Sequence, residues 1–310
     1  MRTTTLFATA FVALCLPNVG CTSNSSSGSS STATGGAAST AGSGGQTGDA
    51  HGANPYPFVY AGGIGVTDLE GASKFLTTVM GMTQEGSDVT RDDRVERTFF
   101  AKEANRGSRV VLMKFNDGRS TQNIPAKLVF EAPDVQLTYQ GAVDAGYTGI
   151  LPPIDVSTIL VSQVTGPDGY TVEILHGLAD GGESPTEPFF IALGFGVSDL
   201  MASEKFYADG FGMKQTVPYS SSDLVEQTME YPHGGGAGLV LQHYDTSMHD
   251  YLNNPVKHVS FVPDVNAFVS QITSAGGTVT QKAAAMPAYG GKLGAVLGDP
   301  DGVVIELVQD

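Results

Sequence analysis

The chain has 310 residues, and its 32 Asp and Glu residues against 16 Lys and Arg residues give a net charge of −16 at neutral pH. This acidic excess argues against anionic partners, so we expect neither nucleic-acid binding nor docking on anionic lipid head groups. The length is sufficient for two hydrophobic cores of ordinary domain size.

The N-terminus has the features of a secretory signal. Arg2 gives a basic start, and residues 6–16 form an apolar run that is too short to span a bilayer. The run leads to a small residue directly before Cys21, which resembles the cleavage and acylation site of a bacterial lipoprotein. Since Cys15 lies inside the signal, the mature chain keeps Cys21 alone and can form no internal disulfide. We predict a signal peptide at residues 1–20 and lipidation of Cys21; an ordinary signal peptide cut nearby is the alternative.

The next segment, residues 21–55, consists largely of Ser, Gly, Thr and Ala and shows no apolar periodicity. Such a composition cannot bury enough surface to fold, so we expect a flexible spacer. No later segment is long and apolar enough to cross a membrane. The lipid would therefore be the sole membrane contact, and the expected location is the bacterial cell envelope, at the outer membrane or the periplasmic face.

Residues 56–178 predict a first folded module. The pattern indicates a strand at 59–66, a helix capped by Asp68, strands near 95–101, 109–115 and 126–132, a helix capped by Asp134 and ended by Gly146, and a strand at 170–175.

Residues 179–188, rich in Gly, Asp and Pro, predict a linker, and residues 189–310 predict a second module of the same kind. This module has a helix from Asp199 to about 209, strands near 224–231, 238–244 and 256–262, a helix capped by Asp264 and ended by Gly276, and a strand at 303–308.

The two modules repeat the same residues at a separation of about 131 positions, which is the mark of duplicated units. Gly-Val-Thr-Asp-Leu at 65–69 corresponds to Gly-Val-Ser-Asp-Leu at 196–200. Each module also carries a Pro-Asp-Gly turn, at 167–169 and at 300–302, that leads to a glutamate, Glu173 or Glu306.

This β-α-β-β-β order, present four times in two pairs, resembles the vicinal oxygen chelate superfamily of glyoxalase I, bleomycin-resistance proteins and extradiol dioxygenases. The resemblance implies an α+β fold in which four tandem βαβββ motifs form two half-barrel modules with helices outside. In that family a concave face holds a divalent metal, which binds substrate oxygens and acts as a Lewis acid.

The resemblance also implies four ligand positions in each module. In the second module they are Ala192, Gln242, His258 and Glu306, and in the first they are Ala61, Met113, Leu128 and Glu173. The first module thus keeps one carboxylate, which cannot hold a catalytic metal by itself.

The second module is a better candidate. Strand alternation places Glu306 on an apolar face, where an unpaired carboxylate is costly, so either a metal or a charged hydrogen bond to His258 is expected. We name Gln242, His258 and Glu306 as a candidate site for Zn, Ni, Mn or Fe, with Glu306 as the candidate general base. Because Ala192 replaces the first-strand ligand, the two-His, one-carboxylate iron site of an extradiol dioxygenase is not expected.

Small residues on the first strands provide a second signal. At period two, one face carries Ala61, Gly63 and Gly65 in the first module and Ala192, Gly194 and Gly196 in the second. If these faces are concave, they leave room for a ligand to approach the backbone. The alternative is a bulge or close helix packing.

Two functions remain open from the sequence. The first is an exported, membrane-anchored, glyoxalase-like protein that binds a small molecule in a cleft, with an incomplete metal site in the second module. The second is a metal-dependent lyase or isomerase of the glyoxalase type that uses Gln242, His258 and Glu306. The sequence is compatible with a monomer or with a module-swapped homodimer.

Overall fold

The computed structural model describes residues 57–102, 108–156, 159–177, 185–233, 236–245, 251–252 and 254–310. The predicted signal peptide, Cys21, the predicted spacer at 21–55 and part of the predicted linker at 179–188 lie outside these residues. In the part of the chain that the structure describes, no helix is long and apolar enough to span a membrane.

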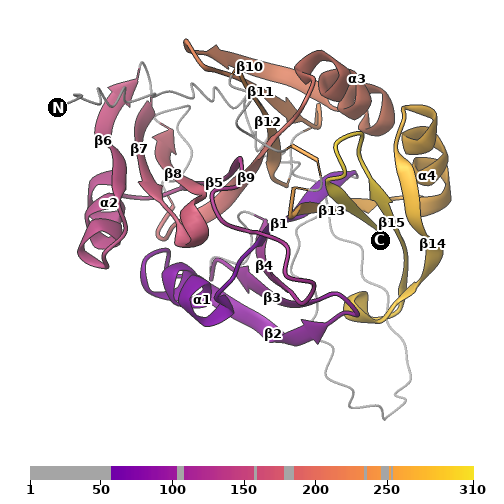
Figure 1. Cartoon of the computed structure of the whole chain (residues 1–310), viewed down its shortest axis with the longest axis horizontal. Helices are drawn as coiled ribbons and strands as arrows, with labels where there is room; N and C mark the ends of the chain where they lie inside the picture. The colour runs from indigo at the N-terminus through magenta and orange to yellow at the C-terminus, as the bar shows by residue number, and fades with distance from the viewer. Residues whose placement is uncertain are drawn as a thin grey trace, which may run out of the picture.

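Four βαβββ motifs follow one another, which confirms the predicted α+β architecture (Figure 1). Motif 1 comprises β1 (Phe58–Gly65), α1 (Leu69–Thr78), β2 (Thr83–Thr90), β3 (Arg94–Phe100) and β4 (Arg109–Phe115). Motif 2 comprises β5 (Ala126–Glu131), α2 (Val135–Asp144), β6 (Gly149–Val156), β7 (Ile159–Thr165) and β8 (Thr171–Gly177). Motif 3 comprises β9 (Phe189–Gly196), α3 (Leu200–Phe211), β10 (Lys214–Ser220), β11 (Leu224–Glu230) and β12 (Gly238–Tyr244). Motif 4 comprises β13 (Val256–Val262), α4 (Val265–Ser274), β14 (Thr278–Met286), β15 (Lys292–Gly298) and β16 (Val304–Gln309).

Each of the four helices begins at an aspartate, as predicted. The N-cap carboxylates accept hydrogen bonds from backbone N–H groups of the first turns, which otherwise have no partner within the helix. The four caps are Asp68, Asp134, Asp199 and Asp264.

The sixteen strands of the described residues form two eight-stranded sheets. The first has the order β14-β15-β16-β13-β1-β4-β3-β2 and combines motifs 1 and 4; we call it half-barrel A. The second has the order β10-β11-β12-β9-β5-β8-β7-β6 and combines motifs 2 and 3; we call it half-barrel B. Each half-barrel therefore takes one motif from each sequence module, and the pairing is completed within one chain (Figure 1).

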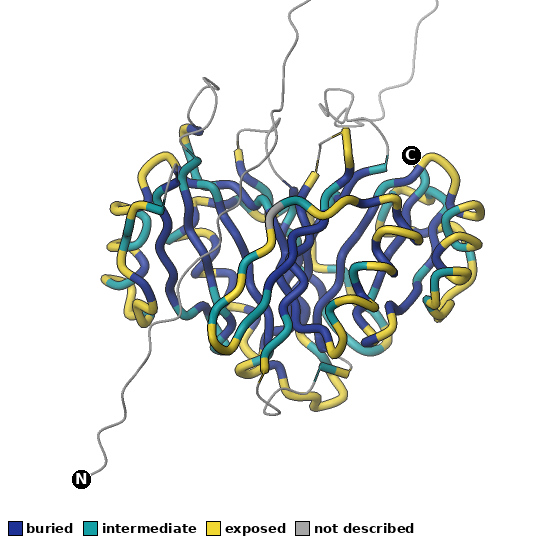
Figure 2. Tube along the Cα trace, turned by 90° about the horizontal axis from the view of Figure 1, so that it is seen from above, coloured by how far each residue is buried: buried dark blue, intermediate teal, exposed yellow. Residues whose placement is uncertain are grey.

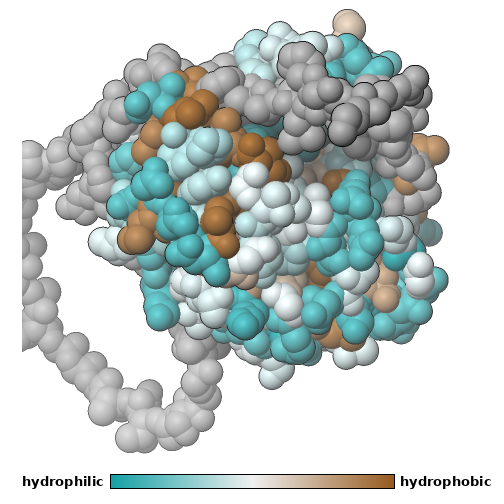
Figure 3. Space-filling model, turned by 60° about the vertical axis from the view of Figure 1, so that its left-hand side comes forward, coloured by the Kyte–Doolittle hydropathy of each residue, from teal (hydrophilic) through white to brown (hydrophobic). Residues whose placement is uncertain are grey.

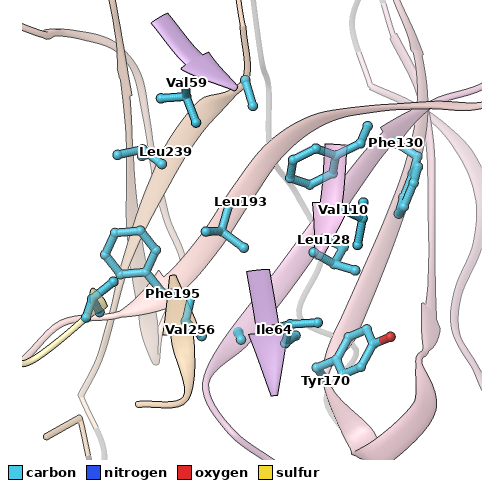
Figure 4. Close-up of a cluster of buried hydrophobic side chains, with 14 of the residues drawn as sticks. Val59, Ile64, Val110, Leu128, Phe130, Tyr170, Leu193, Phe195, Leu239 and Val256 are labelled. Carbon is cyan, nitrogen blue, oxygen red and sulfur yellow. The ribbon is translucent and has the colours of Figure 1, made fainter. Parts of the chain in front are cut away.

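The half-barrels share one hydrophobic core. Ile64 and Val110 of half-barrel A belong to the same buried cluster as Leu128, Phe130 and Leu193 of half-barrel B (Figure 4). Buried positions fill the centre of the molecule, and exposed positions lie mostly toward its outer turns and helices (Figure 2). On the face drawn in Figure 3, apolar residues form separate groups among polar ones, as is usual for a protein surface in water.

The repeated sequence motifs join the two half-barrels. Thr67, which follows β1, donates its backbone N–H to Asp168 of the β7–β8 turn at 2.8 Å, and its hydroxyl bonds to the same carboxylate. Ser198, which follows β9, does the same with Asp301 of the β15–β16 turn, with an N–O distance of 3.1 Å. Each Pro-Asp-Gly turn thus holds the first strand of the opposite half-barrel.

Candidate functional site

Each half-barrel buries a lysine between two glutamates on the face turned away from the shared core, on the inside of the curled sheet. In half-barrel A, Lys257 Nζ lies 2.8 Å from Glu96 Oε1 and 3.3 Å from Glu306 Oε2; we call these three residues cluster A. In half-barrel B, Lys127 Nζ lies 2.9 Å from Glu226 Oε1 and 3.4 Å from Glu173 Oε2; these form cluster B. All six residues are buried.

The two clusters occupy equivalent positions. Lys257 on β13 pairs with Gly63 on β1, and Lys127 on β5 pairs with Gly194 on β9. Glu96 lies opposite Met113 across β3 and β4, and Glu226 lies opposite Gln242 across β11 and β12. The duplication that built the chain therefore also duplicated the cluster.

The predicted glycine faces carry these lysines. A Cβ at Gly63 would lie 2.5 Å from Lys257 Cγ, and one at Gly194 would lie 2.8 Å from Lys127 Cβ, so only glycine fits. At Gly65 and Gly196 the nearest atoms belong to proline side chains among others. Ala61 and Ala192 lie in small apolar clusters on the same faces. The room that these small residues leave at positions 63 and 194 is filled by the protein's own lysine side chains.

Cluster A is closed by three further side chains. Arg94 Nε lies 2.6 Å from Glu96 Oε1, and Arg91 Nη2 lies 3.4 Å from Glu306 Oε1 and 3.5 Å from Glu96 Oε2. Tyr289 donates its hydroxyl to Glu306 Oε2 at 2.8 Å. Although burial opposes the charge of Glu96, Lys257 and Arg94 lower its pKa to about 2. Every carboxylate oxygen of cluster A has a donor.

Among the described residues, cluster B lacks the two arginines of cluster A. By strand register, Leu224 on β11 occupies the position that Arg94 occupies on β3. The backbone N–H of Ser221 donates to the carbonyl oxygen of Leu224, just as the N–H of Arg91 donates to that of Arg94, so Ser221 occupies the position of Arg91. In the part of the chain that the structure describes, cluster B therefore has one cation against two carboxylates, whereas cluster A with its arginines has three cations against two carboxylates.

Two glutamines complete cluster B only in part. Gln163 Nε2 donates to Glu173 Oε2 at 2.8 Å, and Gln242 Nε2 donates to Glu226 Oε1 at 2.6 Å. Glu173 Oε1 and Gln242 Oε1 are buried and have no hydrogen-bond partner. Burial raises the pKa of Glu173, against the opposing effect of Lys127. Half-barrel B thus presents two acceptors that lack a donor.

The structure does not bring together the predicted set Gln242, His258 and Glu306. Lys257 points to the inner face, so alternation turns its neighbour His258 to the other face, where its ring lies 5.4 Å from the ring of Phe211. Burial lowers the pKa of His258 to about 3, which keeps the ring neutral. The predicted pairing of His258 with Glu306 is wrong: the neighbouring Lys257 is the partner of Glu306.

The other two members of that set lie in different half-barrels. Gln242 belongs to β12 of half-barrel B, and Glu306 belongs to β16 of half-barrel A. Both oxygens of Glu306 are engaged by Lys257, Arg91 and Tyr289, so this carboxylate is not available as the predicted general base.

The buried clusters do not fit the divalent metal that the family resemblance implies. At the centre of each stands an ammonium group, which has three donors and no lone pair for a metal. Among the described residues, no group of three or more His, Cys, Asp or Glu side chains is placed to hold a metal ion.

Sequence reasoning missed both lysines and both strand glutamates. A signal was present: each lysine stands at the start of a buried strand in its module, and each of Glu96 and Glu226 follows a valine at the matching position. A charged residue that stands at the same position in both modules indicates that the same buried cluster is present twice.

Comparison with known proteins agrees with this architecture. The sequence profile of the Glyoxalase/Bleomycin resistance protein/Dioxygenase superfamily matches the chain twice, at residues 58–174 and 191–307. The crystal structure of glyoxalase I from Zea mays is 20% identical over 82% of this chain and 92% of that chain, with a TM-score of 0.65. A putative dioxygenase from Bacillus subtilis subsp. subtilis str. 168 is 12% identical over 82% of this chain and 85% of that chain, with a TM-score of 0.58. At such identities the likeness shows the fold alone, and no curated protein matches. The two profile matches show that the chain belongs to the Glyoxalase/Bleomycin resistance protein/Dioxygenase superfamily.

Proposed function

We propose that this protein binds a small molecule on the inner face of half-barrel B, without a metal ion. The observation that carries the proposal is the pair of buried acceptors, Glu173 Oε1 and Gln242 Oε1, that have no hydrogen-bond partner. A buried polar atom without a partner costs about 1–3 kcal/mol, and a bound ligand that donates to it recovers that free energy. Half-barrel A serves as an internal comparison, because its own side chains satisfy the equivalent carboxylates.

The surroundings of cluster B support a ligand site. An apolar cluster lies on the same face of the sheet, with partly buried Ile154, Val156 and Ile191 packed against it. Its buried members are Val129, Leu151, Val161, Leu175, Ala192 and Val240. An apolar surface with a few converging polar groups is typical of small-molecule sites.

The alternative of a metal-dependent lyase or isomerase is not favoured by the side chains present. Although burial opposes its charge, Glu173 and Glu226 raise the pKa of Lys127 above its usual value. The ammonium is therefore a fixed cation, which neither coordinates a metal nor exchanges a proton readily near neutral pH.

The test is a melting-temperature screen with neutral, anionic and cationic small molecules on the purified protein. The variant Ser221→Arg/Leu224→Arg introduces into half-barrel B the arginines that close half-barrel A, so it should block binding whatever the charge of the ligand. We expect at least one compound that stabilises the wild type and not this variant. Equal shifts for both proteins, for every active compound, would contradict binding at half-barrel B.

We further propose that the protein is exported and held at the cell envelope by a lipid on Cys21. The support is the sequence alone: a basic start, an apolar run and a cysteine after a small residue. Replacing Cys21 with serine should move the protein from the membrane fraction to the soluble fraction. Retention of the variant in the membrane fraction would refute the anchor.

A further inference from the structure

The duplicated clusters indicate what kind of group cluster B receives. In half-barrel A, the guanidinium of Arg91 lies against Glu306 Oε1 and Glu96 Oε2, the two glutamates that also bind the buried ammonium of Lys257. The equivalent residues in half-barrel B are Glu173, Glu226 and Lys127. Half-barrel A therefore shows that a Lys-Glu-Glu cluster of this geometry accommodates a second cation.

Resting on the function proposed above, we infer that the ligand of half-barrel B carries a planar cationic N–H donor, a guanidinium or amidinium group, which binds Glu173 Oε1 and Gln242 Oε1. Beside Glu173 the ligand thus takes the part that Arg91 plays beside Glu306, whereas Gln242 is an acceptor that half-barrel A, with Met113 at this position, does not have. Both acceptors belong to side chains that are at least nine-tenths buried, 0% and 3% exposed.

The charge balance favours a cation over a neutral or anionic group. Burial raises the pKa of Glu173, and a cation placed beside it favours the ionised carboxylate. With Glu173 ionised, cluster B holds Lys127 against Glu173 and Glu226, and a monocationic ligand makes it neutral. An anionic ligand would face two carboxylates and would add an unpaired buried charge, which is strongly unfavourable. A neutral amide could donate to the same acceptors, but hydrogen bonds with a charged donor are roughly twice as strong.

The side chains around cluster B are apolar. The buried residues Val161, Leu175 and Val240 lie in the apolar cluster of this face, and the partly buried Ile154, Val156 and Ile191 pack against it. We therefore expect a cationic head on an apolar or aromatic body rather than a polyamine with charges along its whole length.

Three probes of one shape and different charge test this inference: benzamidine, benzamide and benzoate. Isothermal titration of the full chain with each probe should give one benzamidine site per chain, at least about tenfold tighter than benzamide, with no benzoate binding. Titration at two salt concentrations separates this site from general attraction to an acidic surface, because buried pairs are screened less than exposed ones.

Variants locate the site. Glu173→Gln keeps the shape of the side chain and should weaken benzamidine about tenfold or more. The matched variant Glu306→Gln, at the equivalent position of the closed cluster, should leave benzamidine affinity within about twofold of the wild type. Ser221→Arg/Leu224→Arg acts at partly buried positions and should abolish binding even if Glu173→Gln proves poorly folded.

The outcomes separate the two proposals. Binding of benzamide or benzoate that the double arginine variant abolishes would overturn the cationic ligand and leave ligand binding at half-barrel B standing. Benzamidine binding that survives the double arginine variant, or that Glu306→Gln weakens as much as Glu173→Gln does, would overturn both. No binding of any of the three probes would overturn the cationic ligand, and the broader melting screen would then decide the function.

Discussion

A leucine in place of His258 should remove an acid-sensitive contribution to the stability of this protein. The imidazole is fully buried among aromatic rings, at 5.4 Å from that of Phe211 and 5.9 Å from that of Tyr207. Its Nδ1 lies 3.2 Å from Ser260 Oγ, and its Nε2 has no hydrogen-bond partner. Leucine is apolar and of similar size, so it should fit this site and remove an unsatisfied nitrogen.

The size of the effect follows from the pKa of His258, which burial lowers to about 3. In the unfolded chain the pKa of a histidine is about 6.5. A group whose pKa is lower in the folded state contributes stability that is fully present above pH 6.5 and is lost as the pH falls toward 3. Each pH unit in that window is worth about 1.4 kcal/mol, so lowering the pH from 7.5 to 4.5 should cost the wild type about 2–3 kcal/mol through this residue.

Urea unfolding at a series of pH values between 7.5 and 4.5 measures this. We expect His258→Leu to lie within about 1 kcal/mol of the wild type at pH 7.5 and to be about 2–3 kcal/mol more stable at pH 4.5. His176→Gln, at a partly buried histidine, serves as the control and should keep the acid sensitivity of the wild type. Parallel curves for the wild type and His258→Leu would refute the reasoning, because the neutral buried imidazole would then have no energetic consequence.

Three more predictions concern buried charges. Lys127→Met leaves two buried carboxylates without their cation and should destabilise the fold by about 3–5 kcal/mol. The control Lys74→Met, at an exposed position of α1, should change stability by less than about 0.5 kcal/mol, and similar losses for both variants in urea unfolding would contradict the role of cluster B. Arg91→Ser/Arg94→Leu gives cluster A the charge of cluster B and should create a second benzamidine site, which calorimetry would detect as two sites per chain; unchanged stoichiometry would contradict the equivalence of the clusters. Burial raises the pKa of Glu230 to about 7, so its contribution to stability is present below about pH 4.5 and is lost as the pH rises through 7. Glu230→Gln should therefore be more stable than the wild type by about 2–3 kcal/mol at pH 8 and not at pH 4, and an equal difference at both pH values would contradict this assignment.

Much of the fold was predictable because its signals are local and repeated. The aspartate caps mark all four helices, and the duplicated motifs mark two modules. The sequence analysis missed strands β2, β6, β7, β10, β14 and β15. In the edge strands β2 and β14 the side chains are largely exposed and do not alternate between apolar and polar, so the pattern gives no strand signal. The sequence also did not predict that motif 1 pairs with motif 4 and motif 2 with motif 3. A motif buries the same strand faces whichever other motif it pairs with, so its apolar pattern does not identify that motif.

The candidate site was predicted less well, for a reason that concerns strand register. The apolar pattern placed Glu306 on a buried face, and the structure agrees, since Glu306 is buried beside Val308. The predicted partner of Glu306 was wrong because the prediction named His258 instead of Lys257, the residue before it. Neighbouring residues of a strand point to opposite faces, so this difference of one residue places the partner on the wrong face. Lysine is rarely fully buried, so composition alone argued against it. The carboxylates of β3 and β11, which are distant in the sequence, make such a burial favourable together with those of β16 and β8.

A crystal structure of the protein grown with benzamidine tests the central claim most directly, that half-barrel B holds an open copy of a cluster that half-barrel A has closed. We predict density for one amidinium group against Glu173 Oε1 and Gln242 Oε1, with Lys127 still between its two glutamates, and no probe at cluster A. Density for benzamidine at cluster A, or cluster B without a probe at concentrations that saturate binding in solution, would contradict the account.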